Sequence, residues 1–199
     1  MLRLRKIAVT GNLAAGKSTV CHLLKKLGAY VLDSDKIVHS LLLNNSSIKK
    51  AIIKLLGEEG LTKGRIDRSK IAKIVFNSKK NKKLLQLEKI IHPEVLKKIK
   101  QKYQEIKKKN QYQLFVVEMP LLFETKSEKL FNFVIAVIAN QKICSERFGK
   151  DYQKRKQRQM NSFQKIKKAD VVIYNNQDLK SLKKQITNLY SHLTHKENK

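Results

Sequence analysis

Eight residues near the start of the chain combine glycine, lysine and serine in a spacing that suits phosphate binding. They run Gly11-Asn-Leu-Ala-Ala-Gly16-Lys17-Ser18 and satisfy the pattern G-x-x-x-x-G-K-[ST]. In such a loop, backbone N–H groups and the N-terminus of the following helix converge on phosphate oxygens, and Gly16 permits their close approach. We expect Lys17 to bridge the β- and γ-phosphates of ATP and Ser18 to place its hydroxyl on Mg²⁺.

The elements around this loop are those that its chemistry requires. Residues 4–10 form an apolar run typical of a buried strand, and residues 18–27 carry apolar side chains at helical spacing. Gly28 ends that helix, and residues 29–33 have the length and β-branched character of a second strand. The expected nucleotide-binding residues of the segment are Gly11, Asn12, Leu13, Ala14, Ala15, Gly16, Lys17, Ser18 and Thr19.

Three later apolar runs of strand length complete the predicted sheet. They are residues 114–119, 133–138 and 171–174, and a final amphipathic helix follows at 178–192. Because a βαβ unit implies parallel pairing, the pattern predicts an α/β fold of three layers, α/β/α, with a five-stranded parallel sheet, the P-loop nucleoside triphosphate hydrolase fold.

The rest of the chain reads as helical additions to one domain spanning residues 1–199. Between the second and third strands a run of helices without strands is expected at 35–43, 48–56, 68–76, 80–91 and 93–109, the last opened by Pro93. We interpret about 58–112 as a helical substrate-binding insertion. Residues 141–168 have low apolar content, which predicts loosely packed helices and a lid at about 144–168.

Composition favours a cytoplasmic, monomeric protein with no membrane association. The chain has 199 residues and 41% hydrophobic content, enough for one ordinary core. Its two cysteines are far apart and match no metal-ligand spacing, which indicates a reducing compartment. No apolar stretch approaches the roughly 20 residues that span a bilayer.

The formal charge of +28 raises the question of polyanionic partners. The lysines are scattered along nearly every predicted helix, which favours a solvated surface and no specific nucleic-acid partner. The alternative is that the electrostatic field of these lysines attracts a phosphate-rich substrate.

Several segments beyond the loop resemble the dephospho-CoA kinase family, in order and in spacing. The resemblance covers nearly the whole chain. Its segments are Leu32-Asp-Ser-Asp35, Gly64-Arg-Ile-Asp-Arg68 with Val75-Phe76, Leu87-Glu-Lys-Ile-Ile-His92-Pro93, Glu118-Met-Pro-Leu-Leu-Phe-Glu124, Arg155 with Gln159-Met160, and Ala169-Asp-Val-Val-Ile-Tyr-Asn175.

The resemblance implies ATP-dependent phosphorylation of the 3′-hydroxyl of dephospho-CoA, the last step of coenzyme A synthesis. Asp35 then matches the acidic residue near the acceptor hydroxyl, where it would take or orient the proton. Its other reading is an N-cap for the next helix. Asp33, expected on the same strand face, would hold the metal shell or the loop beside the substrate.

Basic residues of the insertion and the lid have implied roles as well. Arg147 and Arg155 match lid arginines that stabilise charge on the transferring phosphoryl group, unless they are solvated helix charges. Arg68, His92 and Pro93 match the region that receives the CoA moiety, where Arg68 would pair with a phosphate. A structural role for His92 is equally compatible with the sequence.

The remaining matches concern the ends of later strands. Glu118 would contact Mg²⁺ through water, in place of the family's more frequent aspartate. Asn175 aligns with a residue expected near adenine. Three residues are expected to line the acceptor cleft, although the two leucines also suit a core: Leu121, Leu122 and Glu124.

The chain departs from the family pattern in the loop and in the lid. Asn12 and Ala14 stand where glycine is usual, and Ala14 tolerates a positive φ less well than Asn12 does. The acidic residue after the first lid arginine is displaced to Asp151. Two other functions stay open on these residues: a nucleoside monophosphate kinase-like enzyme with another acceptor, and a nucleic-acid-binding NTPase.

Overall fold

The computed structural model describes residues 4–76, 82–150, 152–156 and 159–195, without the side chains of residues 76, 154 and 195. The chain divides into two compact units. The first consists of Met1–Asp33 with Tyr103–Lys199, and the second of Ser34–Lys102.

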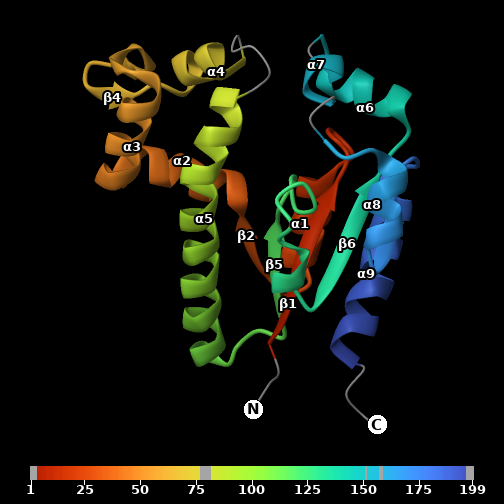
Figure 1. Ribbon diagram of the computed structural model, residues 1–199. Coiled ribbons are helices and arrows are strands. Elements are labelled where there is room, and N and C mark those ends of the chain that lie inside the picture. The colour runs from red at the N-terminus through yellow and green to blue at the C-terminus, as the bar shows by residue number, and fades with distance from the viewer. Residues whose placement is uncertain (1–3, 77–81, 151, 157–158, 196–199) are drawn as a thin grey trace. The chain divides into compact units, whose positions relative to one another are not determined.

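The first unit is built on a five-stranded sheet in the order β2-β5-β1-β6-β7. All four neighbouring pairs of strands are parallel. In this order, strands far apart in the sequence lie side by side (Figure 1). This confirms the predicted sheet. The strands are β1 (Arg5–Gly11), β2 (Tyr30–Asp33), β5 (Leu114–Glu118), β6 (Phe133–Ile138) and β7 (Val171–Tyr174).

One face of the sheet is covered by α1 (Lys17–Lys26) and α9 (Leu179–His195). Alternate strand residues such as Ile7 and Val9 join one core cluster with Leu24 of α1 and Ile186 of α9, all fully buried. Because successive side chains of a strand point to opposite faces, the intervening residues must pack on the other side.

The opposite face is covered by other segments, which completes the three layers. Phe115 of β5 stacks on Tyr30 and meets the edge of Tyr103, which lies near the end of α5 (Lys82–Lys109). Helix α8 (Ser162–Lys168) packs against β6. A short 3-10 helix, η3 (Glu128–Leu130), precedes β6.

The expected lid region forms three short helices, of which α8 is the last. The others are α6 (Gln141–Phe148) and α7 (Tyr152–Lys156), and Asp151 between them lies outside the described residues. The prediction that the whole region is loosely packed was wrong, because Cys144 and Tyr152 are buried in the main core cluster. Their apolar contacts were hidden in the sequence by the surrounding basic and glutamine residues.

Among its described residues, the second unit has three α-helices before α5: α2 (Ser34–Asn44), α3 (Ser46–Leu56) and α4 (Arg68–Phe76). Helix α3 begins where the side chain of Asn45 accepts a hydrogen bond from the N–H of Ile48 at 3.0 Å, an ordinary N-cap. Its buried residues Ile48, Ile52 and Leu56 recur every fourth position and form one apolar stripe.

The expectation of helices without strands was wrong in this unit. After a 3-10 turn, η1 (Glu58–Gly60), strands β3 (Leu61–Thr62) and β4 (Arg65–Ile66) pair antiparallel. Lys63 and Gly64 between them have φ values of 49° and 70°. Positive φ at both central residues is the geometry of a tight two-residue hairpin, which glycine makes accessible.

The sequence predicted that Pro93 opens a separate helix, and this was wrong. Pro93 lies inside the 28-residue helix α5. A proline inside a helix removes one backbone hydrogen bond and costs about 3 kcal/mol. Leu87 before the proline and Val95 and Ile99 after it are all buried. One apolar stripe therefore continues through Pro93, and its burial offsets the loss.

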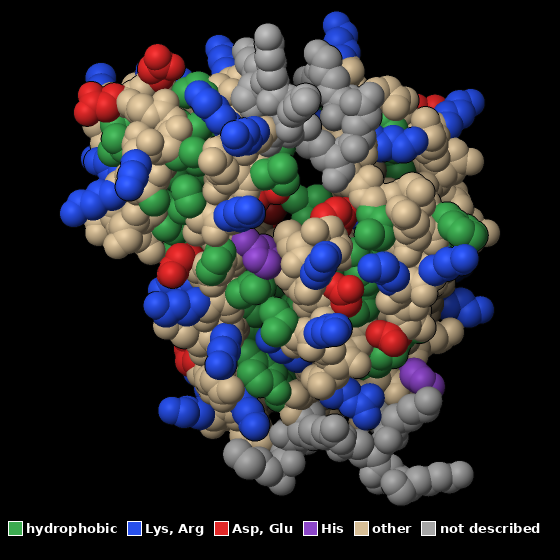
Figure 2. Space-filling view, in the orientation of Figure 1, with side chains coloured by type: hydrophobic (Ala, Val, Ile, Leu, Met, Phe, Trp, Pro, Cys, Tyr) green, Lys and Arg blue, Asp and Glu red, His purple; other side chains and the backbone are tan. Residues whose placement is uncertain are grey.

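The bounds of the second unit, Ser34–Lys102, differ at both ends from the insertion expected at 58–112. Helices α2 and α3 pack on each other and on the segment that follows them, so they belong with it. Within the described residues, no helix is both long enough and apolar enough to cross a membrane. On the face shown in Figure 2, Lys and Arg side chains are spread over the surface and alternate with uncharged groups.

Candidate active site

The phosphate-binding loop leaves β1 at a glycine that the fold requires. Gly11 has a φ of 144°, and a Cβ added there would lie 2.0 Å from the carbonyl oxygen of Val137 in β6. The same carbonyl accepts a hydrogen bond from the N–H of Asn12 at 3.2 Å. The loop therefore starts in close contact with the neighbouring strand, and only glycine leaves room for that contact.

The loop ends at Gly16, whose left-handed φ of 95° introduces α1. Lys17 is buried, and its ammonium donates to the carbonyl oxygen of Asn12 at 2.8 Å, which places the positive charge over the loop. The first N–H groups of a helix lack intrahelical partners, so the start of α1 offers donors to an anion.

Ser18 lies on the first turn of α1 and faces the end of β5. Its hydroxyl donates to Oε1 of Glu118 at 2.9 Å. Glu118 pairs in register with Asp33 at the end of β2. The carboxyl ends of two neighbouring strands thus bring two carboxylates to one edge of the sheet, beside the loop.

The charges of this edge also act on Cys21 of α1. Burial raises the pKa of the Cys21 thiol well above its usual value, and the nearby carboxylates of Glu118 and Asp33 raise it further. The thiol stays protonated at neutral pH and is unsuited to be a nucleophile.

The oxygen-rich edge fits a hard divalent cation. No group of three or more His, Cys, Asp or Glu side chains forms a metal site among the residues described. Mg²⁺ in kinases typically takes only one or two protein oxygens and fills its other positions with water and phosphate. Ser18 and Glu118, 2.9 Å apart, match that requirement.

The two residues that replace usual glycines are accommodated differently. The side chain of Asn12 donates from Nδ2 to the hydroxyl of Ser162 at 2.8 Å and so links the loop to α8. Ala14 adopts a left-handed φ of 58°, a conformation that costs an alanine about 1–2 kcal/mol. The loop therefore keeps a strained backbone at Ala14.

Asn175, expected near adenine, contacts the loop itself. Its Nδ2 donates to the carbonyl oxygen of Ala15 at 2.8 Å, and its backbone N–H donates to Ile138. The same Nδ2 would lie 2.3 Å from a Cβ added at Gly16. Asn175 therefore helps to fix the loop from the end of β7.

The two predicted lid arginines have different surroundings. A Cβ added at Gly16 would lie 3.9 Å from Nη1 of Arg147, so this guanidinium reaches the end of the phosphate-binding loop. The guanidinium carbon of Arg155 on α7 lies 5.4 Å from the ring centre of Phe148. Arg147 is thus beside the loop, whereas Arg155 is exposed and stacks within the α6–α7 region.

The segment after β5 is mostly structural. Leu122 is fully buried, in line with the core role that the sequence had left open for it, whereas Leu121 is half-buried. Oε1 of Glu124 accepts a 2.7 Å hydrogen bond from the N–H of Met160 and forms a 3.1 Å ion pair with Lys165.

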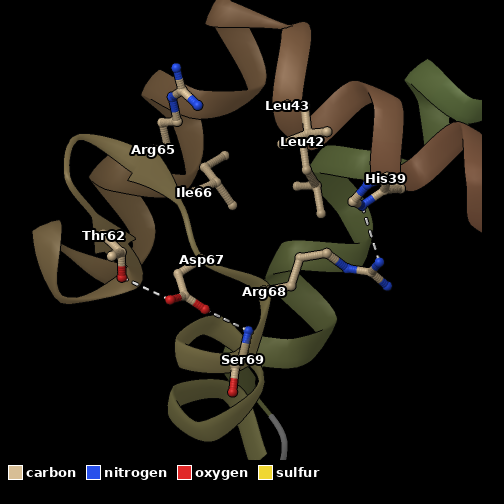
Figure 3. Close-up of a pocket in the computed structure, with 9 residues that line it drawn as sticks. All are labelled: His39, Leu42, Leu43, Thr62, Arg65, Ile66, Asp67, Arg68 and Ser69. Carbon is tan, nitrogen blue, oxygen red and sulfur yellow. Dashed lines mark hydrogen bonds between the residues drawn. The ribbon is translucent and has the colours of Figure 1, made fainter.

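The second unit contains a pocket of about 310 Å³ (Figure 3). Arg68 donates from Nη1 toward Nδ1 of His39 at 3.2 Å across one side of it. On another side, the hydroxyl of Thr62 donates to Asp67 at 2.7 Å, and this bond lowers the pKa of the Asp67 carboxyl. The lining residues are His39, Leu42, Leu43, Thr62, Arg65, Ile66, Asp67, Arg68 and Ser69.

Other predicted acceptor residues lie elsewhere in this unit. Asp35 is exposed in the first turn of α2, where a negative charge is favourable. It does not share a strand face with Asp33, because β2 ends at Asp33. His92 and Pro93 lie in α5 and are not among the pocket residues, and burial lowers the pKa of His92.

Some contacts of the site had no clear signal in the sequence. Lys165 reads there as one more lysine of a basic helix, yet it is fully buried. The partnership of Asn12 with Ser162 joins positions 150 residues apart. Both arise from the tertiary packing of α8, which no local pattern specifies.

Comparison with known proteins agrees with this geometry. The sequence model of the family described as dephospho-CoA kinase matches residues 5–181. The chain belongs to the dephospho-CoA kinase family. A dephospho-CoA kinase from Protochlamydia amoebophila is 41% identical over 97% of this chain and 98% of its own length. One from Chlamydia pneumoniae is also 41% identical, over 94% and 95%.

Solved structures related to this dephospho-CoA kinase family member have the same fold. A protein from Thermus thermophilus superposes with a TM-score of 0.77 at 29% identity, covering 96% of this chain and 99% of that one. A dephospho-CoA kinase from Campylobacter jejuni gives 0.65 at 27% identity, covering 96% and 98%. Members of the family are kinases that catalyse the last step of coenzyme A biosynthesis.

Proposed function

We propose that this protein transfers the γ-phosphoryl group of ATP to the 3′-hydroxyl of dephospho-CoA, giving coenzyme A and ADP. Family membership over residues 5–181 supports the reaction. The observation that carries the proposal is the loop at Gly11–Ser18, where the ammonium of Lys17 lies over the backbone and the hydroxyl of Ser18 meets Glu118.

Different groups of the loop bind different parts of the magnesium–nucleotide complex in this proposal. Backbone N–H groups at the start of α1 receive the phosphate oxygens, and Lys17 neutralises the β- and γ-phosphates. Ser18 directly and Glu118 through water would hold Mg²⁺, which neutralises charge on the phosphates when bound. Asn175 fixes the carbonyl of Ala15 in the loop by donating a hydrogen bond to it.

In the transfer step, the acceptor oxygen forms a bond to the γ-phosphorus as the bond to the β-phosphate oxygen breaks. Asp35 takes the proton of the acceptor hydroxyl, while Asp33, two residues earlier in the chain, supports the metal shell. Arg147 and Arg155 stabilise the charge that spreads over the transferring group. The proximity of Arg147 to Gly16 supports this role for Arg147.

The acceptor is recognised by the second unit in this proposal. Arg68, with Arg65 on the same pocket, offers guanidinium groups that suit a phosphate of dephospho-CoA. His92 and Pro93 contribute from α5, and Leu121 and Glu124 from the segment after β5. Leu122 supports that segment from the core.

A coupled assay of ADP release tests the acceptor. Dephospho-CoA should be turned over in strong preference to nucleoside monophosphates, gluconate and shikimate at equal concentration. An equal rate with a nucleoside monophosphate would favour the alternative kinase and refute the assigned substrate. Asp35→Asn should lose turnover but keep ATP binding in calorimetry, whereas loss of both would contradict an acceptor-side role.

A further inference from the structure

Lys165 on α8 is completely buried, with 0% of its surface exposed. Lysine is almost never fully buried unless its charge is paired and hydrogen-bonded, because removing an ammonium from water is costly. Burial lowers the pKa of Lys165, and the nearby carboxylate of Glu124 opposes that shift. A buried charge of this kind needs a reason in the structure around it.

The ammonium of Lys165 finds three acceptors, one for each of its three N–H groups. It donates to the carbonyl oxygen of Gly11 at 3.2 Å and to that of Pro120 at 3.3 Å. The third partner is Oε1 of Glu124, at 3.1 Å. Its hydrogen-bonding capacity is therefore used entirely inside the protein.

The two carbonyl acceptors lie at the ends of two neighbouring strands. Gly11 is the last residue of β1 and the first of the phosphate-binding loop, and Pro120 follows Glu118 of β5 by two residues. The hydroxyl of Thr10 also donates to the carbonyl of Pro120, at 3.3 Å. Lys165 thus ties the entrance of the loop to the strand end that carries Glu118.

A second contact joins the same helix to the loop. Ser162, one turn before Lys165 on α8, accepts the 2.8 Å hydrogen bond from the side chain of Asn12. Residues three apart on a helix lie on the same side. One side of α8 therefore contacts the first two residues of the loop, Gly11 and Asn12.

We propose that Lys165 is a positioning residue for phosphoryl transfer, holding the phosphate-binding loop and the Glu118 end of β5 at the separation that nucleotide binding requires. The inference rests on the proposed kinase function but concerns its nucleotide half alone. It also assigns α8 to the frame that holds the phosphate-binding loop.

A simpler role for Lys165 is to neutralise the buried carboxylate of Glu124. The two roles differ in what happens once that carboxylate is removed. If neutralisation is the whole role, Lys165 becomes dispensable in a Glu124→Gln background. If Lys165 positions the two carbonyl groups, it remains necessary there.

The experiment compares the single variants Lys165→Met and Glu124→Gln with the double variant. Calorimetry with a magnesium complex of a non-hydrolysable ATP analogue gives the affinity, and thermal unfolding gives the stability. Lys168→Met is the matched control, because Lys168 lies on the same helix with a side chain that is 46% exposed. That control should bind the analogue as the wild type does.

Lys165→Met alone should unfold at a markedly lower temperature, because it strands Glu124 without its cation. In the double variant the unfolding temperature should recover toward that of Glu124→Gln. Its affinity for the magnesium complex of the analogue should stay about 10- to 100-fold weaker than that of Glu124→Gln, the loss typical when a residue that orients the binding groups is removed. The KM for dephospho-CoA should match that of Glu124→Gln.

Equal affinity of the double variant and Glu124→Gln would overturn the proposal and leave charge neutralisation as the role. A higher KM for dephospho-CoA in the double variant than in Glu124→Gln, with unchanged binding of the analogue, would overturn the proposal as well. Failure of the wild type to phosphorylate dephospho-CoA would refute the assigned acceptor, yet the binding comparison would still decide the role of Lys165.

Discussion

The hydroxyl of Ser18 donates to Oε1 of Glu118 across 2.9 Å, although the two residues are 100 positions apart in the chain. This bond joins the first turn of α1 to the end of β5. It preorganises as neighbours the hydroxyl and the carboxylate that we propose to hold Mg²⁺.

Ser18→Ala removes one side of this pair and should weaken the use of Mg²⁺. We expect kcat/KM for ATP to fall about 10- to 100-fold, with a higher Mg²⁺ concentration needed for half-maximal rate. A titration of activity against Mg²⁺ at fixed ATP measures both effects. Ser191→Ala, an exposed serine of α9, serves as the control. An unchanged Mg²⁺ dependence would exclude Ser18 from the metal site.

Gly11→Ala should damage the fold as well as the site. The added Cβ would meet the backbone oxygen of Val137 at 2.0 Å, and the φ of 144° suits only glycine. The strand carbonyl cannot move without breaking its bond to Asn12. We expect a loss of at least about 2 kcal/mol in the free energy of unfolding.

Urea denaturation followed by circular dichroism measures that loss. Gly149→Ala is a useful comparison, because its φ of 87° is also left-handed but no atom of the described residues lies within 4 Å of the added Cβ. The difference between the two variants isolates the contact with Val137. Equal destabilisation by both would mean that the contact adds nothing beyond the backbone conformation.

Ala14→Gly should stabilise the protein. The left-handed φ of 58° costs an alanine about 1–2 kcal/mol, whereas glycine adopts it freely. Glycine also gives the unfolded chain more freedom, which cancels about 0.4–1 kcal/mol. A net gain of about 0.8 kcal/mol, within a range of about 0 to 1.6 kcal/mol, should appear as a higher midpoint in urea. A lower midpoint would show that Ala14 is not strained.

His92 should make the stability depend on pH. Burial lowers its pKa below the ordinary value of 6.5, so the unfolded chain binds this proton more tightly than the folded one. Stability should therefore fall as the pH drops through 6.5 toward the lower, folded-state pKa, and this contribution should vanish above about pH 7.5. The substitution His92→Gln removes this pH-dependent contribution to the free energy of unfolding.

Urea midpoints of the wild type and His92→Gln, measured at pH 8 and at pH 5.5, check the sign. The wild type should lose more stability than the variant between the two. Parallel losses would show that His92 is protonated equally well in both states.

The architecture that carries nucleotide chemistry could be predicted from the order of residues alone. Apolar runs of strand length at 114–119, 133–138 and 171–174 specify buried parallel strands, because both faces of each are covered in the sheet. The loop at Gly11–Ser18 is local in sequence, and its strand and helix follow from hydrophobic period alone. Such features are readable because neighbouring residues suffice to encode them.

Which side chains meet follows from the packing of the folded chain and could not be predicted in this way. The pairs Asn12–Ser162 and Asn175–Ala15 join positions 150 and 160 residues apart. The continuation of α5 through Pro93 likewise depended on an apolar stripe buried on both sides of it. Lys165 looked like a solvated lysine, but the packing of α8 buries it against two strand ends. Contacts of this kind depend on the packing of distant segments, for which a single sequence has no local signal.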